Sequence, residues 1–286
     1  MSGADPIPAI REEDATGEIA ALFADLRTAL GVPFVNLIWR HLATIPGGLA
    51  WTWGVVGPLY GTAALSAAAA ELRGLVALPD LATIPDHAFD AAGVDAEARA
   101  AIRNLIADYN TANAANFLAM LVALAVLRDE ARAAGETRGE TVGRTADGAV
   151  GSVPAIPLPA LADLSPPVLA LVRDLDGFGR LGESAAIASL YRHLAHWPPY
   201  LALARTALSP LHRSGALAAE QERVIAAGRR HAAALAPRAA ARPPLDASSA
   251  DRVVEALDGF TRLMIGRMIV MGTALHGLLE AEGPAR

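Results

Sequence analysis

Residues 38–46, IWRHLATIP, recur 152 positions later as LYRHLAHWP at residues 190–198. Arg, His, Leu, Ala and Pro are identical between the two copies, which makes five matches in nine positions. The same offset aligns GPL at 57–59 with SPL at 209–211, and offsets of 149 upstream and 151 downstream align the flanking apolar residues. Because this period is too long for a solenoid unit, the repeat predicts an ancestral homodimer fused into one chain with a pseudo-twofold axis.

The local signals in each copy are helical. Asp95 precedes apolar residues at helical spacing from Ile102 to Tyr109, and Ser165-Pro166 is typical of a helix cap followed by proline in the first turn. No run of alternating apolar and polar residues stands out. The sequence therefore predicts an all-α chain: a first helical repeat over 1–137, a Gly-, Thr- and Pro-rich linker over 138–159, and a second helical repeat over 160–286.

The composition excludes several classes of function. The net charge is −6 with acidic and basic residues mixed along 286 residues, which argues against a nucleic-acid partner. There is no cysteine, and therefore no disulfide or thiolate metal site. No phosphate-binding glycine loop or serine-hydrolase elbow is found, so we expect no cofactor. The N-terminus lacks the pattern of a secretory signal, and a cytoplasmic location is the expectation.

A membrane span has to be considered for residues 42–70, which contain no Asp, Glu, Lys or Arg. Prolines and glycines break this stretch repeatedly, and its second half is mostly alanine, which inserts poorly into a bilayer. We therefore expect buried core helices here and no membrane partner.

Several short motifs resemble the group I 2-haloacid dehalogenases over nearly the whole chain. They are Thr16-Gly17-Glu18, Leu26-Arg27, Val32-Pro33, Arg40, Leu42-Ala43-Thr44, Pro46-Gly47, Trp53, Thr62, Glu71-Leu72-Arg73, Tyr109-Asn110-Thr111-Ala112-Asn113, Ala188-Ser189 and Trp197-Pro198. The resemblance implies a fused pseudo-dimer with its active site between the copies. In that family a carboxylate activates water, which displaces halide directly at Cα without a covalent ester.

The resemblance breaks at the residues that carry the chemistry. The position of the family's water-activating aspartate is Leu190, and leucine has no lone pair with which to take a proton. The family's threonine is kept as Thr62, but the acid one turn later is Ser66. Asn113 matches the active-site asparagine, and Ser189 matches the serine before the aspartate.

The pocket residues also differ from the family pattern. Phe34 replaces a tryptophan, Leu37 a phenylalanine and Asn116 a substrate-pocket tyrosine. The resemblance implies that the residues binding a small-molecule ligand are Phe34, Leu37, Thr62, Asn113, Asn116, Ser189 and Leu190.

Three side chains are candidates for acid–base catalysis in place of the missing aspartate. His41 and His193 are equivalent in the two copies and fall on apolar helix faces, which predicts a symmetric imidazole pair or, alternatively, two half-buried histidines bonded to backbone. Glu183 lies in the loop before Leu190 and is a candidate for a relocated base, although such a loop glutamate is usually solvated. His193 and His196 have no carboxylate at helical spacing, so we expect no metal site.

The remaining candidates are interpreted as structural. Arg40 and Arg192 fall on the opposite side of their helices from the histidines, where we expect them to be solvated or salt-bridged. Asp108 is expected at the surface, and Phe260 and Met264 are expected to pack in the core.

Three hypotheses remain open at this stage. The chain has kept a buried small-molecule site, for a small organic acid, and lost hydrolytic dehalogenation; or it is an active dehalogenase that uses Glu183; or it is a non-catalytic helical interaction module. The sequence leaves open whether the chain forms a homodimer.

Overall fold

The computed structural model describes residues 7–128 and 156–280, here called the first half and the second half. Within these two ranges every regular element is a helix, which confirms the predicted all-α class. Most of the predicted linker, residues 138–159, lies outside the described residues, so the repeat boundaries stay a prediction.

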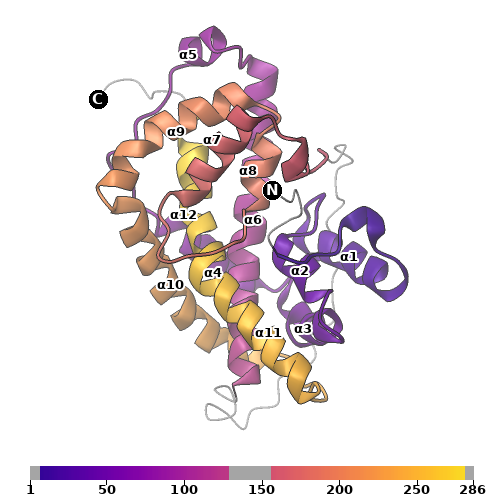
Figure 1. The fold of residues 1–286 in the computed structure, drawn as a ribbon. Coiled ribbons are helices and arrows are strands. Elements are labelled where there is room, and N and C mark those ends of the chain that lie inside the picture. Colours follow the sequence, from indigo (N-terminus) through magenta and orange to yellow (C-terminus); the bar gives the residue numbers. More distant parts are fainter. Residues whose placement is uncertain (1–6, 129–155, 281–286) are drawn as a thin grey trace.

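The order of helices is similar in the two halves (Figure 1). The first half contains α1 (Gly17–Leu30), α2 (Leu37–Leu42), α3 (Gly48–Val56), α4 (Ala63–Gly74), α5 (Asp86–Ala91) and α6 (Ala96–Leu127). The second half contains α7 (Pro166–Gly177), α8 (Ser189–Leu194), α9 (Pro198–Arg213), α10 (Ala216–Leu235), α11 (Ala247–Gly259) and α12 (Gly266–Gly277). Short 3-10 turns occur at Glu12–Asp14, Gly57–Leu59, Leu161–Asp163 and Ala236–Arg238. The short helices α2 and α8 carry the repeated motif.

The core is built around α6, a helix of 32 residues. Its first turn is capped by Asp95, whose Oδ1 accepts the Ala98 N–H at 2.8 Å. The helix packs against α12, α10, α4 and α11, and α6 and α12 lie in the middle of the molecule in Figure 1. Glycine permits close packing of α10 on α6, because a Cβ at Gly228 on α10 would collide with the ring of Phe117.

The last long helical segment of the described residues is interrupted. Between α11 and α12 the chain forms a π-helix, η6 (Phe260–Ile265), so the long helix runs as α11, η6 and α12. Single π-helical turns inside α-helices are often found at functional sites, where they redirect side chains. Three residues of η6, namely Phe260, Met264 and Ile265, line the central cavity described below.

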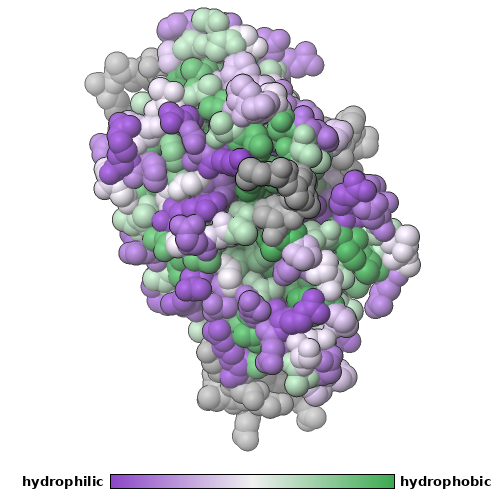
Figure 2. Space-filling model, in the orientation of Figure 1, coloured by the Kyte–Doolittle hydropathy of each residue, from purple (hydrophilic) through white to green (hydrophobic). Residues whose placement is uncertain are grey.

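The apolar stretch at 42–70 forms α3, the turn Gly57–Leu59 and the start of α4, and the chain bends by 93° between the two helices. In the described residues α6 is also long and apolar enough to cross a bilayer, but its most apolar window is 61% buried inside the protein, as in the core helix of a globular protein. On the face drawn in Figure 2, hydrophilic residues are spread widely with hydrophobic residues between them.

Candidate functional site

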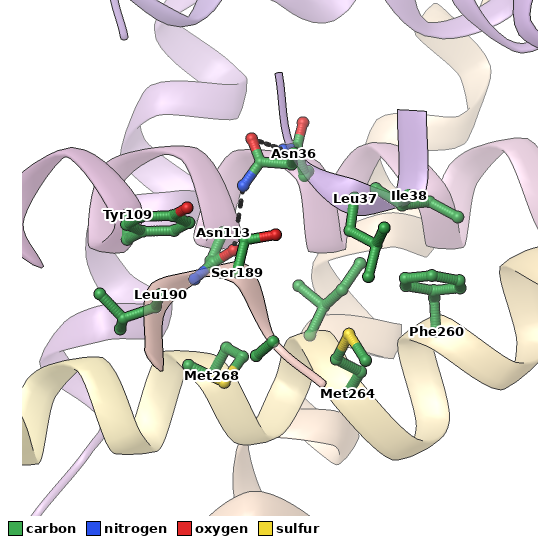
Figure 3. Close-up of a pocket in the computed structure, with 13 residues that line it drawn as sticks. Asn36, Leu37, Ile38, Tyr109, Asn113, Ser189, Leu190, Phe260, Met264 and Met268 are labelled. Atoms are coloured by element: carbon green, nitrogen blue, oxygen red, sulfur yellow. Dashed lines mark hydrogen bonds between the residues drawn. The ribbon is translucent and has the colours of Figure 1, made fainter. Parts of the chain in front are cut away.

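A small cavity lies between the two halves (Figure 3). Its volume is about 390 Å³, including the part that is open to solvent. This is at the small end of the range for ligand cavities and suits a small molecule. It is lined by Asn36, Leu37, Ile38, Tyr109, Asn113, Asn116, Ala188, Ser189, Leu190, Phe260, Met264, Ile265 and Met268.

The two halves contribute unlike surfaces to this cavity. The first half supplies what we call the polar wall: Asn36, Tyr109, Asn113 and Asn116. The second half supplies the apolar wall: Ala188, Leu190, Phe260, Met264, Ile265 and Met268. Figure 3 shows Tyr109 and Asn113 on α6 facing Met264 and Met268 across the cavity. Ser189 is the polar residue that the second half contributes.

A chain of hydrogen bonds orients the amides of the polar wall. The Trp39 indole donates to Asn116 Oδ1 at 3.0 Å, and the Tyr60 hydroxyl donates to the same oxygen at 2.7 Å. Asn116 Nδ2 donates to Asn36 Oδ1 at 3.0 Å, and Asn36 Nδ2 makes a longer contact of 3.4 Å with Asn113 Oδ1. Because an indole can only donate, it fixes the orientation of each amide after it. Asn113 is therefore left with its NH₂ group turned away from the chain.

This last amide group has no partner. Asn113 is 7% exposed and lines the cavity, and its Nδ2 makes no hydrogen bond within the described residues. Buried polar groups are normally paired, since leaving one unsatisfied costs about 1–3 kcal/mol. The cavity therefore presents one free donor group that a ligand acceptor can satisfy.

A second set of hydrogen-bonded side chains includes Ser189, the residue before Leu190. Arg40 Nη2 donates to Ser189 Oγ at 3.1 Å, and the Tyr109 hydroxyl lies 2.8 Å from His193 Nδ1. Burial lowers the pKa of His193 to about 4, so its ring is neutral at neutral pH. Burial also raises the pKa of Tyr109 well above its ordinary value. Tyr109 is thus a hydrogen-bonding group and not a base near pH 7.

Most of the predicted ligand-binding residues reach this cavity. Those that line it are Leu37, Asn113, Asn116, Ser189 and Leu190. Phe34 lies behind the polar wall, where its ring stacks on Tyr109 with 4.2 Å between centroids. Whether these residues bind a ligand stays a prediction, but the structure brings them together.

Thr62 lies outside the cavity lining and caps α4. Its Oγ1 accepts the Leu65 N–H at 3.2 Å and donates to the Leu59 carbonyl at 2.7 Å. Ser66, which the resemblance aligns with an acid, is exposed on the same helix. Glu183 is also exposed and does not line the cavity. Thus none of these three side chains lines the cavity that Leu190 lines.

The predicted imidazole pair does not form, because the two histidines have different neighbours. His41 Nδ1 donates to the Pro8 carbonyl at 2.7 Å, and its ring stacks on Phe260 in a separate surface groove. His193 is buried against Tyr109. His196 is exposed and hydrogen-bonded to the Pro157 carbonyl. Among the described residues no three His, Asp or Glu side chains cluster as metal ligands.

Of the two alternatives predicted for Arg40 and Arg192, solvated or salt-bridged, the solvated one is wrong. Each is only 5% exposed. Arg40 also donates to the Val35 carbonyl, and Arg192 donates to the Pro159 carbonyl. Both α2 and α8 are six residues long and are covered on both faces by the chain segments around them, so a helical wheel does not separate an inner from an outer side.

Sequence reasoning did not predict Asn36, Tyr109 or, apart from Leu190, the apolar wall as lining residues. Phe260 and Met264 were interpreted as core, and they are buried, but they also line the cavity. The available signal was the repeat itself: at the offset of 151, Tyr109 aligns with Phe260 and Asn113 with Met264.

Leu190 is 1% exposed and lies next to Ser189 in the cavity lining. Among the lining residues, Tyr109 is the one titratable side chain. No carboxylate or imidazole therefore meets a molecule held in this cavity.

Comparisons with known proteins agree with this architecture. Two solved structures of D-2-haloacid dehalogenase, a mutant in complex with D-2-CPA and a complex with L-LA, match with TM-scores of 0.76 and 0.73 at 20% and 19% identity, each over 96% of both chains. The chain has the fold of the D-2-haloacid dehalogenases. A third structure, of a mutant of the same enzyme, matches with a TM-score of 0.72 at 19% identity.

A curated relative, (R)-2-haloacid dehalogenase from Pseudomonas putida, is 35% identical over 82 residues. The match spans 28% of this chain and 27% of that enzyme, about a quarter of its length. No protein-family model matches the chain. The resemblance to the 2-haloacid dehalogenases predicted from the motifs is thus confirmed, by the shared fold over 96% of the chain and by sequence over this segment.

Proposed function

We propose that the protein binds a small organic acid or its amide in the cavity between its halves and has lost hydrolytic dehalogenation. The observation that carries the proposal is the unpartnered Nδ2 of Asn113, which is held by an ordered amide chain and faces a small, mostly apolar space. A preorganised donor in a mostly apolar cavity is a typical means of orienting a small ligand.

The loss of hydrolysis follows from what the lining lacks. In-line displacement of halide needs a base that holds the attacking water within hydrogen-bond reach. Leu190 has no proton-accepting atom, and no other lining residue is a carboxylate or an imidazole. The exposed position of Glu183 supports this proposal over an active dehalogenase with a relocated base.

The proposal includes the pseudo-dimer. We propose that residues 1–137 and 160–286 are fused copies whose contact forms the site, with 138–159 as the linker. The helix order supports this, because α2 and α8 begin and end at an offset of 152, and α6 and α11 begin at an offset of 151. The cavity supports it too, since residues 36–38 and 188–190 line it at the same offset.

Thermal unfolding with a panel of small organic acids and amides tests the binding proposal. We expect at least one compound to raise Tm in the wild type and in Asn104→Leu, an exposed control position on the same helix. Asn113→Leu should abolish that shift. No shift with any compound would argue for a non-catalytic interaction module instead.

A further inference from the structure

The central cavity is nearly closed in this structure. Each of its lining residues is at most 7% exposed. Because protein interiors are close-packed, a molecule the size of a small organic acid reaches such a cavity only when side chains move aside. The side chains that move therefore belong to the way in which the proposed site works.

A surface groove meets the cavity at two shared side chains. Phe260 and Met264 of η6 line both spaces. The segment before α8 runs along both as well, since Ser184–Ala186 line the groove and Ala188–Leu190 line the cavity. The groove has a volume of about 1130 Å³, including the part that is open to solvent. In the view of Figure 3, Phe260 lies at one end of the cavity and Leu190 lies toward the other. At the Phe260 end, side chains that belong to both linings separate the groove from the cavity.

The ring of Phe260 is held from the groove side. His41 lines the groove but not the cavity, and its ring stacks on Phe260 with 5.8 Å between centroids and 27° between planes. His41 is fixed in turn by the hydrogen bond from its Nδ1 to the Pro8 carbonyl at 2.7 Å. Since a stacked aromatic pair stabilises its members only modestly, His41 keeps the Phe260 ring in place without locking it there.

Both shared side chains can change position while the helices stay folded. Met264 is unbranched and has three rotatable bonds. Phe260 is the first residue of the π-helix, and π-helical turns occur frequently at functional sites. We infer that the groove is the entrance to the central cavity, that Phe260 and Met264 form its gate, and that His41 holds the gate closed. This inference rests on the proposed function, because an entrance serves a ligand site, but the route itself can be tested without a ligand.

Thiol labelling of a reporter in the cavity tests the route, because the chain contains no cysteine. In Ser189→Cys one thiol replaces a hydroxyl of the cavity lining, and iodoacetamide alkylates it in the folded protein only after entering the cavity. Mass spectrometry of the full chain measures the rate. In this background Phe260→Ala should raise the rate at least about tenfold, because it removes most of the gate. His41→Ala, which removes only the stacked neighbour, should raise it about threefold.

Ile265→Ala is the matched control for the opened gate. It truncates another residue of η6 that lines the cavity but not the groove, and it should leave the labelling rate nearly unchanged. A urea series separates entry from global unfolding, because labelling through unfolding speeds up as stability falls, whereas entry through a local opening does not.

A second pair of variants fills the groove and leaves the gate intact. Ala185 is exposed and lines the groove, so Ala185→Trp should slow labelling of the reporter severalfold. Ala202→Trp, at an exposed position on α9 outside the groove, should not slow it.

Equal labelling rates in Phe260→Ala and Ile265→Ala, or in the two tryptophan variants, would overturn the inference. The expected pattern would support the entrance even if no compound of the acid and amide panel raises Tm, a result that would contradict the binding proposal alone.

Discussion

Three residues of the polar wall align with apolar-wall residues at the offsets of the sequence repeat, and at each of these three positions a hydrogen-bonding side chain is replaced by an apolar one. Tyr109 corresponds to Phe260, and Asn113 to Met264, at the offset of 151. Asn36 corresponds to Ala188 at the offset of 152. A symmetric cavity would bind a small molecule in two orientations, whereas this one holds its donor on one side only. The difference therefore orients a ligand, with its polar group toward α6 and its alkyl group toward η6 and α12.

The walls also differ in how they are held. The amides of the polar wall are tied to the donor-only side chain of Trp39, whereas the apolar wall combines flexible methionines with a π-helix. Mutations should therefore disturb the two walls to different extents.

The largest expected effect is on the polar wall. Asn116→Leu leaves the Trp39 indole, the Tyr60 hydroxyl and Asn36 Oδ1 without their partner, and three unpaired buried groups should lower the free energy of unfolding by about 4 kcal/mol. Met268→Leu on the apolar wall conserves volume and should cost less than about 1.5 kcal/mol. Urea denaturation of both variants checks this, and equal losses would contradict the difference between the walls.

The next effect distinguishes His193 from His41 by the pH dependence of the free energy of unfolding. The pKa of His193 falls from about 6.5 in the unfolded chain to about 4 in the folded protein, so the unfolded state binds the proton more tightly. The free energy of unfolding should therefore drop by about 3 kcal/mol as pH falls from 6.5 to 4. Urea denaturation across this range should show a weaker pH dependence in His193→Gln and the wild-type dependence in His41→Gln. The same slope in His193→Gln and wild type would show that His193 is not the group responsible.

A smaller effect follows from copying the polar wall onto the apolar wall. Met264→Asn places an amide opposite Asn113, whose free Nδ2 can donate to the new oxygen, but the new NH₂ group has no acceptor among the apolar wall and should cost about 2 kcal/mol. A compound of the panel that stabilises the wild type should recover part of this loss, provided that the introduced amide faces it. Thermal unfolding with and without that compound measures the loss and the recovery. A variant as stable as the wild type would show that the apolar wall tolerates polarity.

The smallest effect is expected outside the cavity. Thr62→Ala removes the cap of α4 and should lower the free energy of unfolding by about 1 kcal/mol. Because Thr62 does not line the cavity, the Kd of a bound amide should be unchanged. A large loss of binding would return Thr62 to the ligand site, where the family resemblance puts it.

The fold was predictable because its signals are local and repeated. The motif around Arg40 and Arg192, together with helical periodicity, was enough to predict an all-α chain, and motif positions led to Asn113, Ser189 and Leu190. The environments of individual side chains were not predictable in the same way. His41 and His193 hold the same place in the motif, yet one bonds to Pro8 near the N-terminus and the other is buried under Tyr109.

The orientation of the amide groups in the site also could not be predicted from the sequence. The direction of an amide chain depends on which donor-only group ends it, and Trp39 and Asn116 meet only in the folded structure. The burial of Arg40 has the same origin, since it depends on what covers a short helix and not on the helix itself.

Halide release from racemic 2-chloropropionate by wild type, Leu190→Asp and Leu190→Asn tests the central claim most directly. The wild type should release no chloride above background, because nothing in the cavity lining can activate water. Leu190→Asp should release chloride, and the neutral Leu190→Asn, compared at equal folded fraction, should not. Chloride release by the wild type at a rate that Leu190→Asp does not exceed would contradict the account.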